Sequence, residues 1–196
     1  MNRRLFLATA LSGLAIAPPG IALAQDAAAA QALVRRVSDD VLTLIRSTSA
    51  EAEKKAEFTA IMDRYANMRQ IAGFALGRYA RTMPGSLKSR YVEAFKRFVS
   101  ATYVKSFSEY SGETITVGTA RPTRNGYTVD TTVERGSQPS LDIRWELSDR
   151  SGQPLVEDFV IEGISMATSQ RGEFTALIDS YGGDLEKFVQ YLESRG

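Results

Sequence analysis

Histidine and cysteine, two of the side chains most often used in catalysis, are missing from this sequence of 196 residues. The chain therefore lacks the usual general base at neutral pH and the commonest zinc ligand, and it can form neither a thiolate nor a disulfide. Catalysis would have to rest on carboxylates, lysine, tyrosine or serine in a strongly tuned environment. Ser165 and Ser169 have no histidine to activate them. The composition argues against an enzyme.

The remaining polar groups form no pattern that is typical of a metal, cofactor or phosphate site. Asp39 and Asp40 are adjacent on a predicted helix surface, which is too sparse for metal binding. Gly118 and the pair Gly182-Gly183 lie outside any phosphate-loop motif. We therefore expect no catalytic residue, no bound metal and no cofactor.

Residues 1–24 have the features of a signal peptide. Asn2-Arg3-Arg4 is basic, and an apolar run follows it. Pro18-Pro19-Gly20 then breaks the run ahead of a small-residue cleavage site, Ala22-Leu23-Ala24. The run is shorter than the ~20 residues that span a bilayer. The arginine pair also resembles a twin-arginine signal, so both the Sec and the twin-arginine export routes stay open. We predict removal of residues 1–24 and one domain over residues 25–196.

The charge balance says which partners to expect. The net charge of the full chain is +1, and removal of Arg3 and Arg4 with the signal peptide leaves −1. Proteins that bind nucleic acid carry a basic field. We therefore expect no nucleic-acid partner.

Helical periodicity covers both ends of the predicted domain. Apolar residues recur at helical spacing over residues 26–45, from about Ser49 to Tyr65, and over residues 67–81. After a central region of different character, the pattern returns near residues 168–181 and 184–192. The most informative helix covers residues 87–110, where a wide aromatic stripe includes Tyr91, Phe95, Phe98 and Tyr103. At about 24 residues this helix reaches roughly 35 Å.

The central region has the period of β-strands. Apolar and polar residues alternate over residues 115–118, 127–134 and 141–148, and less cleanly over residues 155–164. Gly, Asn and Pro residues of typical turns join these segments. Such alternation predicts an antiparallel meander with one face against a core. The order of the segments predicts an α+β domain, a curved antiparallel β-sheet wrapped by helices.

Two charged residues stand out within these elements. Arg78 is expected on a helix surface in a salt bridge, with a docking role as the alternative. Glu162 lies in a largely apolar predicted strand, where a buried carboxylate needs a partner such as an arginine. We expect a structural ion pair at Glu162.

Several short motifs follow one another in a recognisable order. Phe74-Ala75-Leu76-Gly77-Arg78-Tyr79 precedes Tyr91-Val92-Glu93-Ala94-Phe95 and Thr102-Tyr103, and Val160-Ile161-Glu162-Gly163-Ile164-Ser165 precedes Arg171-Gly172-Glu173-Phe174. In this order, behind a signal peptide, the sequence resembles the MlaC family, also called the toluene-tolerance family, from about Ala32 to Leu192. The chain departs from many members at Gln170 and Ala80, where an aromatic residue is usual.

The resemblance implies a function and partners. It implies a periplasmic phospholipid carrier of Gram-negative bacteria that is a monomer. The carrier shuttles lipid between an outer-membrane lipoprotein–porin complex and an inner-membrane ABC transporter with an MCE-protein ring. This traffic maintains the lipid asymmetry of the outer membrane. The implied fold is NTF2-like, with a hydrophobic lipid pocket lined by the sheet and the long helix. On this sequence the lining maps to Tyr91, Phe95, Phe98, Tyr103, Val129, Ile143, Trp145, Phe159, Ile161 and Ile164.

Other interpretations stay open at this point. The aromatic stripe is of a kind that fills an ordinary core, and a carrier of another lipid such as a hopanoid would fit the resemblance too. NTF2-like folds also house small-molecule enzymes, whose site here would need Asp130 or Asp142 beside Tyr127. The alternation places both carboxylates opposite the apolar faces of their strands. A third alternative is a periplasmic module that binds a polypeptide in an exposed groove.

Overall fold

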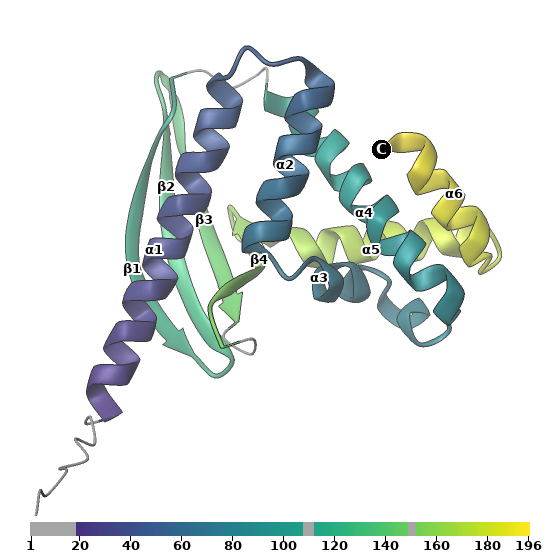
Figure 1. The fold of residues 1–196 in the computed structure, drawn as a ribbon, viewed down its shortest axis with the longest axis horizontal. Helices are drawn as coiled ribbons and strands as arrows, with labels where there is room; N and C mark the ends of the chain where they lie inside the picture. Colours follow the sequence, from purple (N-terminus) through teal and green to yellow (C-terminus); the bar gives the residue numbers. More distant parts are fainter. Residues whose placement is uncertain (1–18, 108–111, 149–151) are drawn as a thin grey trace, which may run out of the picture.

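The computed structural model describes residues 19–107, 112–148 and 152–196, and it has the predicted α+β fold (Figure 1). Helices α1, α2, α3 and α4 and a short 3-10 helix, η1, precede an antiparallel sheet, and α5 and α6 follow it. The bounds are α1 Pro19–Arg46, α2 Glu51–Tyr65, α3 Met68–Ala75, η1 Gly77–Arg81, α4 Gly85–Ser106, β1 Thr114–Thr123, β2 Gly126–Arg135, β3 Gln138–Ser148, β4 Leu155–Ile161, β5 Ile164–Ser165, α5 Met166–Ser180 and α6 Leu185–Arg195.

The sheet is a meander in the order β1-β2-β3-β4-β5, in which every neighbouring pair is antiparallel. Trp145 pairs with Val129 on one side and with Phe159 on the other, so these apolar side chains share the inner face. Asp130 pairs with Arg144 on the outer face. The period of two in the sequence thus separates an apolar face from a charged one.

The predicted fourth strand is shorter than expected, because the chain turns at Glu162-Gly163. Both residues have positive φ angles, 49° and 82°, and Ile161 pairs with Ile164 across the turn. Positive φ at both central residues is typical of a tight hairpin turn. Glu162 is exposed, and its carboxylate accepts a hydrogen bond from the backbone N–H of Asp142 at 2.8 Å. The expectation of a buried Glu162 paired with an arginine is wrong, because the residue lies in a turn.

One predicted helix is divided in two at a glycine. The predicted helix over residues 67–81 divides into α3 and η1 at Gly77, whose φ of 55° is costly for other residues. Helix α4 ends at Ser106, and residues 108–110 of its predicted range lie outside the described residues. The predicted signal peptide, residues 1–24, also lies mainly outside them. No helix in the described ranges is long and apolar enough to cross a membrane.

The elements form two regions with different cores. Helix α1 lies along β1 and β2 beside α2, which in turn contacts α4 (Figure 1). Away from the sheet, α3, α4, α5 and α6 bury a cluster of their own that includes Tyr91, Phe95, Phe174 and Phe188. We call the first the sheet region and the second the helical region. The end of α4 reaches back to the sheet region, where Val104 and Phe107 pack with Leu44 and Ile61.

Candidate functional site

A cavity of about 330 Å³ lies in the sheet region, between the inner face of the sheet and helices α1, α2 and α4. Each element contributes because its apolar stripe faces this space. The lining residues are Val37, Ser38, Val41, Leu42, Ile45, Phe58, Ile61, Met62, Tyr65, Ala66, Tyr103, Ser106, Phe107, Glu113, Ile115, Val133, Leu141, Ile143, Trp145, Val156, Phe159 and Ile161.

A second cavity of about 110 Å³ adjoins the first and extends toward α3 and α5. Phe58, Tyr103 and Phe159 line both cavities, and their rings lie in contact. The ring centroids of Phe58 and Tyr103 are 6.1 Å apart, and those of Tyr103 and Phe159 are 5.8 Å apart. These three aromatic side chains thus stand between two branches of one apolar space.

The polar groups of the wall are mostly bonded to the protein itself. The indole N–H of Trp145 donates to Thr131 Oγ1 at 3.0 Å, and the Thr131 hydroxyl donates to the Ile143 carbonyl at 3.3 Å. The Tyr65 hydroxyl donates to Asp40 Oδ2 at 2.8 Å, which ties α2 to α1. The wall therefore presents mainly hydrocarbon to whatever occupies the cavity.

Ionisable groups contribute little to this wall. Glu113 is the charged residue that lines the larger cavity in the described part of the chain, and it is buried. Burial, with a smaller effect of the Asp158 and Glu173 carboxylates, raises the pKa of Tyr103 to about 12. The phenol is therefore neutral at physiological pH. A mainly apolar space of this kind favours hydrocarbon over charged ligands.

The structure brings together six of the ten residues named from the sequence. Tyr103, Ile143, Trp145, Phe159 and Ile161 line the larger cavity, and Phe95 lines the smaller one. Contact of these residues with a ligand stays a prediction.

The other four residues lie elsewhere. Tyr91 and Phe98 pack in the helical region, where the Tyr91 hydroxyl donates to the Ala72 carbonyl at 2.8 Å. Val129 is fully buried under α1. Ile164 is 58% exposed after the β4–β5 turn. None of the four lines either cavity in the described residues.

Sequence reasoning missed the walls that α1 and α2 contribute. Val37, Val41 and Ile45 form an apolar stripe on α1, and Phe58 and Ile61 form one on α2. These stripes were recognisable by their spacing, but spacing does not say whether a stripe meets a solid core or a hollow.

The outer face of the sheet carries charge. Arg144 Nε donates to Asp130 Oδ1 at 2.8 Å, and Arg121 donates to the other carboxylate oxygen. Burial opposes ionisation of Asp130, but the hydrogen bonds from Arg144 and Arg121 outweigh it and lower the pKa of the carboxyl. Asp142 is exposed and accepts from Thr132 at 2.9 Å. Neither carboxylate lines the cavity, which is the place where an NTF2-like enzyme would need one.

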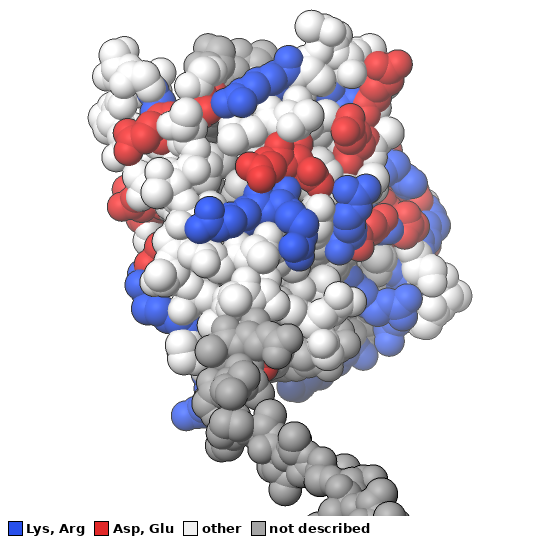
Figure 2. Space-filling model, turned by 60° about the vertical axis from the view of Figure 1, so that its left-hand side comes forward, with Lys and Arg blue, Asp and Glu red and all other residues white. Residues whose placement is uncertain are grey.

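Figure 2 shows the molecule turned so that the left side of Figure 1 comes forward. Over this face, basic and acidic side chains lie next to one another.

In the helical region, Arg78 makes the salt bridge that the sequence led us to expect, with Asp179. Hydrogen bonds from Tyr79 and Arg78 lower the pKa of Asp179. Among the described residues, no group of three or more carboxylates is arranged to hold a metal ion.

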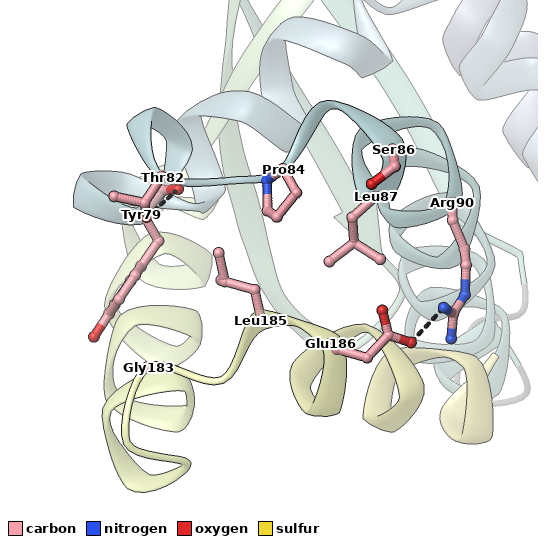
Figure 3. A pocket seen from close by; sticks show the side chains of 9 residues that line it. All are labelled: Tyr79, Thr82, Pro84, Ser86, Leu87, Arg90, Gly183, Leu185 and Glu186. Carbon is pink, nitrogen blue, oxygen red and sulfur yellow. Dashed lines mark hydrogen bonds and ion pairs between the residues drawn. The ribbon is translucent and has the colours of Figure 1, made fainter.

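A wider hollow of about 710 Å³ lies on the surface of the helical region (Figure 3). Tyr79, Leu87 and Leu185 lie on its floor and sides, and the Arg90–Glu186 ion pair closes one end. Its rim residues Thr82, Pro84 and Ser86 are exposed. This hollow offers less apolar enclosure than the cavity of the sheet region, so we take the cavity as the candidate site.

Comparison with known proteins agrees with this arrangement. The sequence model of the MlaC protein family matches residues 35–194, which include most of the described domain. The chain belongs to the MlaC family.

A solved structure of the same fold supports the assignment. The chain is similar to a phospholipid-binding protein from Ralstonia solanacearum, whose structure contains a phospholipid. The TM-score is 0.69 at 20% sequence identity, and the match covers 85% of this chain and 96% of the Ralstonia chain. The family match over residues 35–194 includes the sheet, α2, α4 and the part of α1 that lines the cavity.

Proposed function

We propose that this MlaC-family protein is a periplasmic carrier that holds the acyl chains of a phospholipid in the cavity between the sheet and helices α1, α2 and α4. The observation that carries the proposal is the mainly apolar wall of that cavity, in which neither lysine nor arginine takes part within the described residues. The phospholipid in the related Ralstonia structure supports the same ligand class.

The hydrophobic effect sets the size of the task. Each buried methylene is worth ~0.8 kcal/mol, so one chain of about 15 methylenes costs about 12 kcal/mol to expose to water. The cavity must therefore cover nearly the whole hydrocarbon. At about 330 Å³ it lies near the lower end of the range for ligand pockets, roughly 300–1,000 Å³. A diacyl lipid would extend into the smaller branch by displacing the rings of Tyr103 and Phe159.

The predicted signal peptide and the family membership lead to the cellular role. The carrier passes lipid between the outer-membrane lipoprotein–porin complex and the inner-membrane MCE-protein ABC transporter, and it helps to keep the outer membrane asymmetric. It acts as a monomer and performs no catalysis. The mainly apolar wall supports a binding role, because Asp130 and Asp142, the carboxylates that an NTF2-like enzyme site would need here, lie off the cavity.

Native mass spectrometry of the mature chain, purified under native conditions from a Gram-negative host, tests the ligand. We expect about one diacyl lipid per chain. The mass of the released ligand also separates a phospholipid from a hopanoid. Preparations that repeatedly contain only ligand-free protein would rule out the carrier.

A further inference from the structure

Ser38 is a polar residue in an apolar place. It lies on α1 between Val37 and Val41, is 3% exposed and lines the larger cavity. Its hydroxyl oxygen has no hydrogen-bond partner in the structure. A serine inside a helix usually bonds back to a carbonyl of the preceding turn, and Ser38 does not. A buried hydroxyl without a partner in the protein itself is destabilising, so it marks a place where a bound molecule can supply the hydrogen bond.

The other buried hydroxyls of the neighbourhood have partners. Thr131 donates to the Ile143 carbonyl and accepts from Trp145, and Ser100 donates to the Lys55 carbonyl at 2.7 Å. Among the described residues, Ser38 alone has a buried side-chain oxygen or nitrogen left without a partner. The unpaired hydroxyl of Ser38 is therefore specific to the cavity and is not a general feature of this fold.

The charge of the wall limits what Ser38 can bind. In the described part of the chain, neither lysine nor arginine lines the larger cavity, and Glu113 is acidic. A phosphate would face an uncompensated desolvation cost there. The partner must be an uncharged acceptor attached to hydrocarbon. In a glycerolipid, the acceptors nearest the hydrocarbon are the carbonyl oxygens of the acyl esters.

We infer that the Ser38 hydroxyl donates a hydrogen bond to an ester carbonyl of the bound lipid, so that the protein selects diester lipids over diether lipids. The inference rests on the proposed function, because it assigns one polar contact within the same cavity. A diether lipid of equal chain length fills the same hollow but lacks the carbonyl. Its ether oxygens do not occupy the position of the carbonyl oxygen, so the hydrogen bond that the diester accepts from Ser38 is lost.

A competition experiment tests the contact. Delipidated protein is loaded from vesicles that contain equal amounts of dipalmitoyl phosphatidylethanolamine and of the diether lipid with the same chains and head group. Native mass spectrometry then gives the ratio of the two complexes. We expect the unmodified protein to favour the diester roughly three- to tenfold, the range of one net hydrogen bond. Ser38→Ala should bring the ratio close to one.

Ser100→Ala is the matched control. Ser100 is also a buried serine, but it lines neither cavity and its hydroxyl donates to the Lys55 carbonyl at 2.7 Å. We expect this variant to keep the preference for the diester. Thermal unfolding of the delipidated proteins provides a second measurement. Ser38→Ala should be at least as stable as the unmodified chain, because it removes a buried polar atom without breaking a hydrogen bond.

The outcomes separate the two proposals. If the unmodified protein takes up neither lipid, the proposed function fails. If it takes up both lipids equally, or if Ser38→Ala keeps the preference for the diester, the carrier stands and the contact of Ser38 with the ester is wrong.

Discussion

The helical region and the sheet region contain similar side chains but differ in how completely they pack. In the helical region, the rings of Phe174 and Phe188 are 4.9 Å apart, and Phe95 meets Phe174 edge-on at 6.0 Å. In the sheet region, Trp145 and Phe159 also touch, at 6.1 Å, yet a cavity of about 330 Å³ remains beside them. Residue type alone therefore does not decide which region is hollow.

The difference in packing follows from the elements that pack together in each region. In the helical region, α4 packs against α6, and helices interlock their side chains at short axial distances. In the sheet region, α1 lies along β1 and β2, while α2 lies between α1 and α4. Because a sheet twists, a layer of straight helices contacts only part of its inner face. The space left between them is available to a ligand.

The largest expected effect compares one phenylalanine from each region. Phe188 is fully buried in the helical region, whereas Phe159 is half-buried on the cavity wall. Phe188→Ala should destabilise the delipidated protein by about 3–5 kcal/mol, and Phe159→Ala by roughly 1–2 kcal/mol, because one side of its ring already lacks packing partners. Urea unfolding measures both values. Equal losses would contradict the division into a solid region and a hollow one.

The next largest effect comes from filling the hollow. Ile143→Trp, on the central strand of the cavity wall, should displace about three methylenes of the lipid and weaken lipid binding roughly fiftyfold, at ~0.8 kcal/mol for each methylene. Lipid loading followed by native mass spectrometry measures the change. Ile164→Trp is the matched control, because Ile164 is exposed and lies off the cavity wall. A similar loss in both variants would show that the effect does not arise from the hollow.

Two tyrosine hydroxyls give a smaller contrast. Tyr91→Phe removes a buried hydrogen bond to the Ala72 carbonyl, which keeps the Leu76 N–H at 3.3 Å as its other donor, and should cost about 1–1.5 kcal/mol. Tyr65→Phe removes the hydrogen bond to Asp40. Because this carboxylate is partly exposed and keeps its contact with Arg64 at 3.2 Å, the loss of unfolding free energy should stay below about 1 kcal/mol. Thermal and urea unfolding provide the comparison. A larger loss for Tyr65→Phe would mean that the Tyr65–Asp40 bond between α1 and α2 stabilises the fold more than the Tyr91–Ala72 bond in the helical region does.

The smallest effect is the response to acid. The pKa values of Asp130 on the sheet and of Asp179 in the helical region are both lowered in the folded protein, as is that of Glu193, which Arg90 contacts. Their stabilising contribution is therefore complete above the ordinary carboxyl pKa of about 4, and it is lost as the pH falls through the lowered values. All three carboxylates are at the surface or close to it, so the unfolding temperature should fall only slightly in this range.

An NMR titration of the carboxyl carbons sharpens this prediction. Arg144→Ala should raise the pKa of Asp130 toward its ordinary value and leave the pKa of Asp179 unchanged, because the two carboxylates have separate partners. If the variant leaves Asp130 unchanged, the Arg144 contact does not control its ionisation.

Particular residues show how far the sequence leads toward the site. Ile143, Trp145, Phe159 and Ile161 were predicted in the wall from the strand alternation together with the family resemblance, and they line the cavity. Tyr91 belongs to the same helical stripe as Tyr103 but lies where α4 meets α6 and α3. The stripe is continuous in sequence, and its two ends face different regions. A helical period cannot reveal that change of neighbours.

The sequence by itself determined the α+β order of elements, the inward and outward faces of the strands, the lack of histidine and cysteine chemistry, and the family. The first three properties are local or compositional, so periods of 3.6 and 2 residues and simple counts suffice to predict them, whereas the family followed from the resemblance of several motifs in a fixed order. Only the tertiary structure decided where hydrocarbon walls close and where they stay apart, that Glu162 lies in a turn, and that Ser38 faces the hollow. The cavity and the place of Ser38 depend on the distance between elements that are far apart in the chain, and the turn at Glu162 depends on backbone angles that the apolar residues around it hide.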